Sequence, residues 1–328
     1  MFQAMEERPS TDGHSSVGGQ AVIEGVMIRA AHRIVTVVRR SGGDMVVREE
    51  EYTPLSKRYK LLNLPVVRGA VSFFEMLVIG IKTLNYSADI AIQEERQRTS
   101  SKRPKQDDRF AAVLLGATVF FSLALGLGIF FFLPLFIVGL FGIERDALTF
   151  NMFAGMIRIG LFLIYLSVIS KWKEISRIFE YHGAEHKSIF AFEAGETLTV
   201  ENVKKYKTMH PRCGTSFLLV VVVLAILIFS IADTAFVYVV GHRQNLLERF
   251  ATHLCFLPVI AGISYELLKL SGKRRDRKLT RILIAPGLWL QKITTKEPDD
   301  EQLEVALVAL RGALGEANPA ASSQQNRE

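Results

Sequence analysis

The chain has 328 residues, of which 49% are hydrophobic and 22% charged, and its formal net charge is +7. The apolar residues gather in a few long blocks between basic segments, a distribution typical of a multi-span membrane protein rather than of a soluble domain. Because the lysines and arginines flank these blocks, the positive charge does not indicate nucleic-acid binding. The two cysteines, Cys213 and Cys255, argue against a disulfide framework.

The N-terminal region predicts a short disordered segment and then a small β-rich element. Residues 1–16 are polar and lack the apolar core of a signal peptide, so we expect them to be disordered. Residues 17–60 are expected to form a cytoplasmic β-rich element. Within it, branched apolar residues on both sides of a turn at 41–44 predict a β-hairpin over 33–52, and residues 17–30 predict a further strand.

An amphipathic helix is predicted over residues 65–92. Polar residues recur there every seven positions and form one stripe on an otherwise apolar surface. We expect this helix to lie in the membrane interface or against the membrane bundle, and a re-entrant segment or a fifth span is the alternative. The stripe consists of Arg68, Glu75, Lys82 and Asp89.

Four membrane spans are predicted within residues 110–268. Lysine and arginine are abundant before the first span, between the second and third, and after the fourth, whereas the other two connections hold few. The positive-inside rule therefore places both termini and the loop 171–215 in the cytoplasm. The expected fold class is a mainly α polytopic membrane protein with four transmembrane helices, a small cytoplasmic β-hairpin element and amphipathic interfacial helices. The predicted spans are 110–143, 152–170, 216–240 and 250–268.

Two charged residues lie well inside the predicted spans. Arg158 in the second span and Asp233 in the third lie at a similar depth, about 9 Å from the outer surface at a rise of about 1.5 Å per residue. An unpaired charge at such a depth is costly, so we expect these two residues to pair with each other. The alternative is that each side chain reaches the interface separately.

After the last span, residues 269–312 are expected to form a cytoplasmic amphipathic tail. Its first part contains Trp289, a residue type favoured at membrane surfaces. Its second part begins with acidic residues and continues with helical apolar spacing, which predicts a short soluble helix. Residues 313–328 are expected to be disordered.

The segment YHGAEHK, residues 181–187, predicts a metal site. The histidines His182 and His186 are four residues apart on one packed helical face, so both imidazoles can reach one metal ion. With Glu185 between them they match the order H-x-x-E-H of the inverted zincins, in which the glutamate is a general base. The alternative is a buried helix face whose histidines are satisfied by hydrogen bonds.

Further ligands are expected from the segment HPRCGTSF and from the end of the fourth span. His210 and Cys213 are good ligand types, and they precede a helix whose N-terminus favours a thiolate. Glu266 lies at the same expected depth and can act as a ligand or pair with Arg212. A structural role for Cys213 is the alternative, and a thiol nucleophile with His210 or His186 as its base stays open.

Five motifs, in the order of the chain, resemble the bacterial YqhQ-type family of membrane proteins: GGQAVIEGVMIR, LPVVRG, YHGAEHK, HPRCGTSF and LWLQKITTKEPDDEQLEVAL. The similarity extends from Gly18 to Leu310. Members of this family carry a domain of unknown function and are described as predicted metal-dependent enzymes. The resemblance therefore implies a bacterial inner-membrane protein, but it does not indicate a substrate. It also places Glu24, Arg29 and Arg68 in motifs beside the histidine segment, where they are expected to join the site.

The first hypothesis is therefore a membrane-embedded, metal-dependent hydrolase with its site at the cytoplasmic interface. The two histidines of YHGAEHK would bind a divalent metal, zinc being the expected one, and Glu185 would activate water. Arg29, Arg68 or Arg212 would hold an anionic group of the substrate. The substrate class, peptide or lipid-derived, stays open.

Two rival hypotheses remain. In the first, the His-Glu cluster is structural and fastens the hairpin to the bundle of a scaffold or regulatory protein. In the second, the chain is a transporter, although four spans with few polar groups and no visible internal repeat argue against it. The expected partner is the lipid bilayer, no nucleic acid is expected, and a homo-oligomer is compatible with the sequence.

Overall fold

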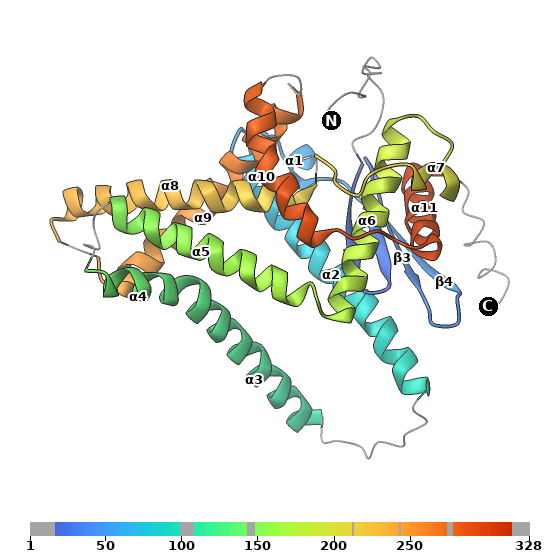
Figure 1. Ribbon diagram of the computed structural model, residues 1–328, viewed down its shortest axis with the longest axis horizontal. Helices are drawn as coiled ribbons and strands as arrows, with labels where there is room; N and C mark the ends of the chain where they lie inside the picture. Colours follow the sequence, from blue (N-terminus) through green and yellow to red (C-terminus); the bar gives the residue numbers. More distant parts are fainter. Residues whose placement is uncertain are drawn as a thin grey trace.

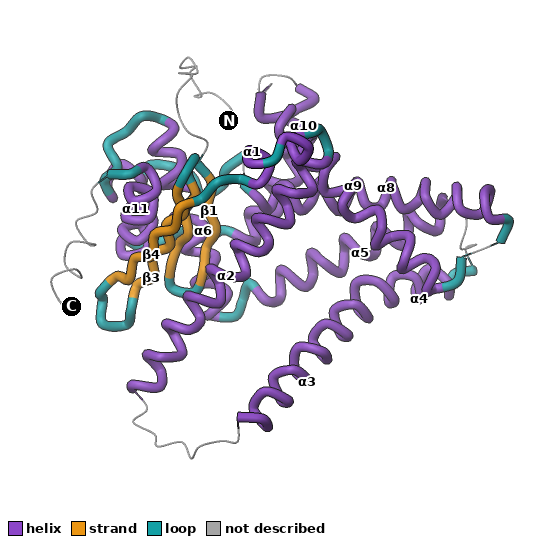
Figure 2. Tube along the Cα trace, turned by 180° about the vertical axis from the view of Figure 1, so that it is seen from behind, coloured by secondary structure: helices purple, strands orange, loops and turns teal. Residues whose placement is uncertain are grey.

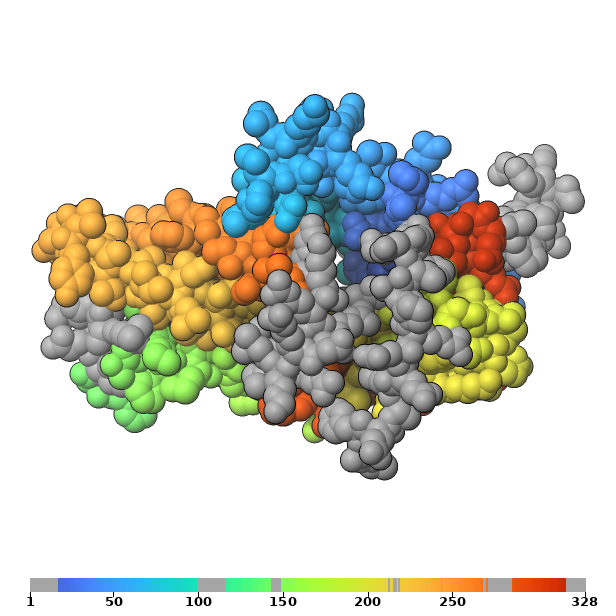
Figure 3. Space-filling model, turned by 90° about the horizontal axis from the view of Figure 1, so that it is seen from above, coloured from blue at the N-terminus to red at the C-terminus, as the bar shows by residue number. Residues whose placement is uncertain are grey.

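The computed structural model describes residues 17–98, 108–142, 148–211, 213–242, 244–273 and 278–316. The predicted disordered segment 1–16, and 317–328 from the predicted disordered C-terminal segment, lie outside these ranges. Long helices extend from one end of the molecule, and a small β-sheet with its covering helices forms the other end (Figure 1). Seen from above, the gold and orange helices again occupy the end opposite the yellow and red ones that cover the sheet (Figure 3).

Four antiparallel strands form the sheet in the order β1-β2-β3-β4. The predicted hairpin is confirmed, because β3 (Arg33–Arg39) pairs with β4 (Met45–Glu51) around the predicted turn. The segment 17–30, predicted as one strand, forms two: β1 (Gly18–Val22) and β2 (Gly25–Arg29).

Both faces of the two central strands, β2 and β3, are buried, because helices from distant parts of the chain cover them. Residues of one face, such as Ile28 and Val35, share a core with Leu303 of α11 (Asp300–Leu314) and with α6 (Lys173–Glu193). On the other face, Met27 packs with residues of α2 (Val67–Arg98). Figure 2 shows the strands between α2 on one side and α6 and α11 on the other. The alternation of side chains along each strand explains how one strand serves both layers.

The predicted helix 65–92 corresponds to α2, which packs against the sheet and against α9 (Leu246–Lys273). Its first turn approaches α9 very closely, since a Cβ on Gly69 would lie 2.8 Å from the Gly262 carbonyl oxygen. Among the described residues, α2 is not one of the helices that are long and apolar enough to cross a membrane. The expectation that it lies against the bundle therefore holds, and it also forms one layer around the sheet. Two short turns precede it: α1 (Leu55–Arg58) and η1 (Lys60–Asn63).

Four segments are long and apolar enough to span a membrane, as the sequence predicts: Gly116–Leu140, Thr149–Ile169, Leu219–Val240 and Leu246–Leu267. The first comprises α3 (Asp108–Leu127), a π-helical turn η2 (Gly128–Phe132) and α4 (Leu133–Leu140). The others lie in α5 (Leu148–Ile169), α8 (Gly214–Val240) and α9.

The predicted pair between Arg158 and Asp233 is wrong. Asp233 instead accepts hydrogen bonds from Arg249 (2.5 Å) and from the ring of His253 (2.9 Å). Arg158 donates through Nε to the carbonyl oxygen of Phe130 at 2.8 Å. That carbonyl lies four residues before Pro134, which has no N–H to offer it, so the arginine satisfies an acceptor that the helix leaves open.

The expected C-terminal tail forms two helices that belong to the body of the protein. α10 (Lys278–Thr294) packs across α8, and α11 lies buried against the sheet. Asp299 and Gln302 close a capping box at the start of α11. The helix predicted there is confirmed, and its apolar face completes the core of the sheet. It extends to Leu314, so the expectation that disorder begins at residue 313 is wrong for its last two residues. A short helix, α7 (Val200–Lys204), connects α6 to the segment before α8.

The segment after α10 crosses α6 at Gly183. Lys296 donates its backbone N–H to Phe179 O at 2.9 Å, and a Cβ on Gly183 would overlap the Lys296 carbonyl oxygen. Since the obstacle is backbone, we expect Gly183→Ala to lower the free energy of unfolding by about 1–3 kcal/mol, as measured by thermal unfolding. Gly160→Ala in α5 is the control, because a Cβ there meets nothing within 4 Å. Equal stability of the two variants would contradict this close approach.

Candidate metal centre

The helix α6 is buried over most of its second half, because the sheet, α11 and the segment after α10 surround it. Its first turn follows closely on α5, so it continues one of the candidate spans into the sheet end of the molecule (Figure 1). His186 is 1% exposed and Glu185 5%. Such burial of polar side chains requires specific partners.

Backbone carbonyl groups orient both histidines of this helix. His182 donates from Nδ1 to Thr294 O at 2.8 Å, and His186 donates from Nδ1 to Thr208 O. A carbonyl oxygen can only accept, so both Nδ1 atoms carry a proton, and in the neutral rings both Nε2 atoms therefore keep a lone pair. This is the arrangement in which an outer hydrogen bond fixes the tautomer of a metal-binding histidine.

The lone pairs of the two imidazoles face the thiol of Cys213. His182 Nε2 lies 3.2 Å from Cys213 Sγ, and one ligand atom from each of the three residues lies within 4.8 Å of the other two. Cys213 is also close enough to His186 for its side chain to act on the pKa of that ring by hydrogen bonding and by charge. Burial lowers the pKa of His186, which favours the neutral ring that a metal requires.

Glu185 lies beside this cluster against β1. A Cβ on Gly19 would come within 2.9 Å of its carboxyl group, so the strand approaches it as only glycine allows. Burial raises the pKa of Glu185 to about 8, while a backbone hydrogen bond from Gly19 opposes that rise. One of its oxygen atoms is buried and has no hydrogen-bond partner in the described part of the chain. Such an orphan acceptor suits a site that receives a further group.

His210 lies next to the cluster without joining it. Its Nε2 is 3.4 Å from Glu193 Oε1, and its ring lies 5.7 Å from that of His186 between ring centres. Gln291 of α10 holds the backbone of His210 with two hydrogen bonds, 2.7 Å to its N–H and 2.8 Å to its carbonyl. The segment that ends at Cys213 is therefore fixed to α10.

Glu266, the other predicted ligand, lies elsewhere. It accepts two hydrogen bonds of 2.6 Å from Arg68, in a bidentate ion pair that joins α9 to α2. This pair sits near the close approach of Gly69 and Gly262 and is not part of the cluster. The pair therefore occupies both Glu266, which was expected to be a metal ligand, and Arg68, which was expected to bind substrate.

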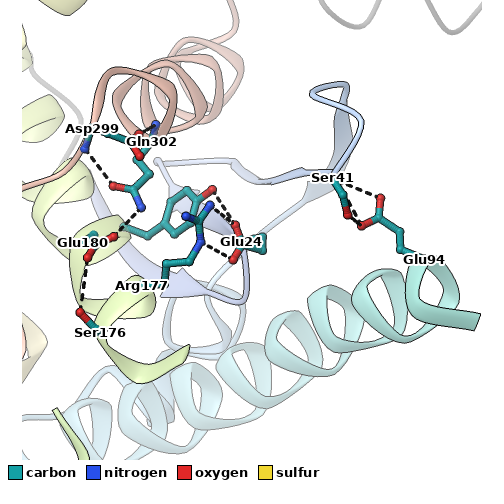
Figure 4. A network of polar contacts seen from close by, with 9 residues as sticks. Glu24, Ser41, Glu94, Ser176, Arg177, Glu180, Asp299 and Gln302 are labelled. Carbon is teal, nitrogen blue, oxygen red and sulfur yellow. Dashed lines mark hydrogen bonds and ion pairs between the residues drawn. The ribbon is translucent and has the colours of Figure 1, made fainter. Parts of the chain in front are cut away.

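The other predicted substrate-binding residues also have partners away from the cluster. Arg29 donates to Tyr52 Oη at 3.3 Å, and Arg212 lies outside the described residues. Glu24, in the turn between β1 and β2, accepts two hydrogen bonds from Arg177 of α6, at 2.5 and 2.6 Å (Figure 4). This pair fixes the β1–β2 turn to α6, and that turn belongs to the hairpin that carries Gly19.

A hollow of about 490 Å³ lies on the far side of this ion pair, between the β3–β4 turn and the end of α2. Its walls carry four arginines and four glutamates, several of them paired with one another. Glu94 of α2 closes one side by accepting hydrogen bonds from the Ser41 backbone and hydroxyl groups (Figure 4). The three residues of the metal cluster do not line this hollow.

Several residues that build the centre could not be identified from the sequence. Thr208 and Thr294 act through backbone carbonyl groups, which every residue type has. Gly19 and Gly183 act by allowing close approach. Only Gln291 offered a weak signal, as an amide within an apolar helical pattern that is fully buried in the structure.

Comparison with known proteins places this fold and its centre in one family. A family model described as "Protein of unknown function (DUF1385)" matches residues 64–316. The chain belongs to this family. It is also 34% identical over 319 residues to the "Uncharacterized protein YqhQ" of Bacillus subtilis (strain 168), a match that covers 95% of each chain. No solved structure matches the chain significantly.

In this member of the family, Gln291→Leu tests how the Cys213 segment is held. The substitution removes both hydrogen bonds that the Gln291 side chain makes to the buried backbone of His210, so we expect a loss of about 1–3 kcal/mol in the free energy of unfolding, measured by denaturant or thermal unfolding. Lys292→Leu is the control, since the neighbouring side chain is exposed. A Gln291→Leu protein as stable as the control would show that the segment does not depend on α10.

Proposed function

We propose that this protein is a metal-dependent hydrolase whose divalent metal, zinc, is held by His182, His186 and Cys213. The observation that carries the proposal is the pair of Nδ1 hydrogen bonds to backbone carbonyls, which aim two imidazole lone pairs at one thiol. Two nitrogen ligands and one sulfur ligand suit zinc, and catalytic zinc sites use three protein ligands with one position open. The donor set therefore fits a catalytic centre better than a closed structural one.

When bound, zinc supplies a Lewis acid that polarises a carbonyl group and lowers the pKa of water. The residues of the chain supply the rest. Glu185, buried beside His182 and Cys213, accepts the proton of the attacking water and later returns it to the leaving group. The nearby positive charge of a metal ion stabilises its carboxylate form against burial. His182 is partly exposed, so this side of the centre is the one open to a substrate.

The proposed site lies at the cytoplasmic face of the inner membrane. Cys213 comes six residues before the candidate span Leu219–Val240, and α6 follows closely on the span in α5. The concentration of lysine and arginine in residues 171–215 supports a cytoplasmic location for this side of the bundle. A substrate embedded in or attached to the membrane surface reaches this depth.

A thiol nucleophile is the second candidate, favoured by the 3.2 Å contact between Cys213 and His182. Cys213 directly precedes α8, whose N-terminus stabilises a thiolate. Here His182 would be the base, in place of the His186 or His210 expected from the sequence. The two candidates differ in their need for a metal.

Metal content distinguishes them. We expect the purified protein to contain about one zinc ion per chain, since a three-ligand site in a buried pocket binds tightly, and we expect His182→Ala/His186→Ala to contain none. Elemental mass spectrometry on protein purified without chelators measures both. His32→Ala is the matched control, because His32 is exposed and lies in the β2–β3 turn. Absence of any transition metal from wild type, after reconstitution with zinc, would leave the thiol mechanism or a structural cluster.

Glu185→Gln separates a general base from a ligand. We expect this variant to keep its metal and to lose hydrolysis of a generic ester or peptide library by at least about 100-fold, the usual contribution of a positioned base. A parallel loss of metal and activity would make Glu185 a ligand. Full activity with full metal content would remove it from the mechanism.

A further inference from the structure

A second buried polar cluster lies at the opposite end of the bundle from the metal centre, near the turn between α8 and α9 (Figure 1). Its members are 3–7% exposed: Asn151 of α5, Asp233 of α8, and Arg249 and His253 of α9. Three helices that are otherwise strongly apolar thus bring four polar side chains together. Buried ionisable groups in such helices are costly and point to a function.

One guanidinium group links the cluster. Arg249 donates from the same nitrogen to Asn151 Oδ1 and to Asp233 Oδ2, the latter at 2.5 Å. His253 donates from Nε2 to Asp233 Oδ1 at 2.9 Å, and its ring stacks on Phe229 with 3.9 Å between ring centres. Both oxygens of the carboxylate are therefore engaged.

The cluster has more positive than negative charge. Asp233 balances Arg249, and His253 needs no charge to make its bond. Arg158 of α5 adds a second guanidinium, which lies within electrostatic range of Arg249 and Asp233 and donates to the neutral carbonyl of Phe130. Glu248, the acid next to Arg249 in sequence, faces Asn245 and His242 at the turn. Within the described residues, the buried Arg249 and the partly buried Arg158 thus have one carboxylate nearby, that of Asp233.

Two hydrogen-bond donors of the cluster are buried and have no partner among the described residues: Arg249 Nε and Asn151 Nδ2. The two side chains are joined by a direct hydrogen bond from Arg249 Nη2 to Asn151 Oδ1, which brings both donors to the same contact between α5 and α9. A buried donor without an acceptor costs about 1–3 kcal/mol. In native structures, such a donor usually binds an ordered water molecule or an ion.

We propose that this end of the bundle binds one small monovalent anion, such as chloride, between Arg249 Nε and Asn151 Nδ2. An anion satisfies both donors and also neutralises the excess charge of the two arginines. A water molecule satisfies the donors alone and leaves a net charge buried, which is unfavourable in an apolar bundle. The site uses residues of three helices and is independent of the metal centre and of the function proposed for it.

The test is an anion titration of the detergent-purified protein. Sodium chloride replaces sodium gluconate at constant ionic strength, and the melting temperature is recorded. We expect a rise of roughly 3 °C for each tenfold increase in chloride above its dissociation constant. Formate in place of chloride shows whether the site also takes a carboxylate. A melting temperature that responds to neither anion overturns the proposal and assigns the two donors to water.

Asn151→Asp supplies a permanent negative charge at the same position. We expect this variant to lose at least half of the chloride-dependent shift of wild type. Ser264→Ala in α9 is the matched control, since Ser264 is buried but bonds only to its own helix. An unchanged chloride shift in Asn151→Asp overturns the proposed position of the anion. Should that variant fail to fold, Asn151→Leu removes the donor without adding charge and must also reduce the shift.

Discussion

The arrangement of the protein around its candidate metal centre depends on two backbone carbonyl groups that hold the histidines of α6. Thr208 O and Thr294 O come from segments 86 residues apart that flank α8 and α10. For both to reach one helix, α10 must lie across the start of α8, and the segment after it must pass directly over Gly183. The membrane bundle and the sheet end are thereby fixed to each other at the point where the imidazoles meet Cys213.

The sequence predicted the parts of this arrangement that periodicity encodes. Alternating apolar residues predicted the hairpin, and the length of the apolar segments predicted the four long helices. The helical period placed His182 and His186 on one face. What it could not give is the choice of partners. Glu266 and Cys213 are both acceptable ligand types at a similar expected depth. The close packing of α2 on α9, however, places Glu266 in an ion pair with Arg68. α11 was predicted as a short soluble helix, but its own pattern does not show the two-sided sheet that it covers.

The wrong pairing of Arg158 with Asp233 has the same origin. Depth along a span identifies residues that need a partner, whereas the packing of neighbouring helices decides which partner is within reach. α9 runs directly beside α8 and brings Arg249 and His253 to Asp233. Pro134 leaves the carbonyl of Phe130 without its helical donor, and Arg158 fills that role. Pro134 in one candidate span thus determines the hydrogen-bond partner of Arg158 in another.

The sheet is an integral part of this protein, although the family model matches only from residue 64 onward. Its two faces are covered by α2 on one side and by α6 and α11 on the other, and all three helices lie within the matched region. Without the strands, the buried face of α11 around Leu303 and Leu310 would be exposed to water, at a cost of about 1.5–3 kcal/mol for each large apolar side chain. β1 also brings Gly19 against Glu185, and the backbone of Gly19 forms a hydrogen bond that opposes the rise in the pKa of the carboxyl group caused by burial. The similarity to the Bacillus subtilis relative extends over this region as well, since it covers 95% of the chain. The strands and the long apolar helices therefore form one unit, in which the N-terminal residues contact a helix more than 160 positions later.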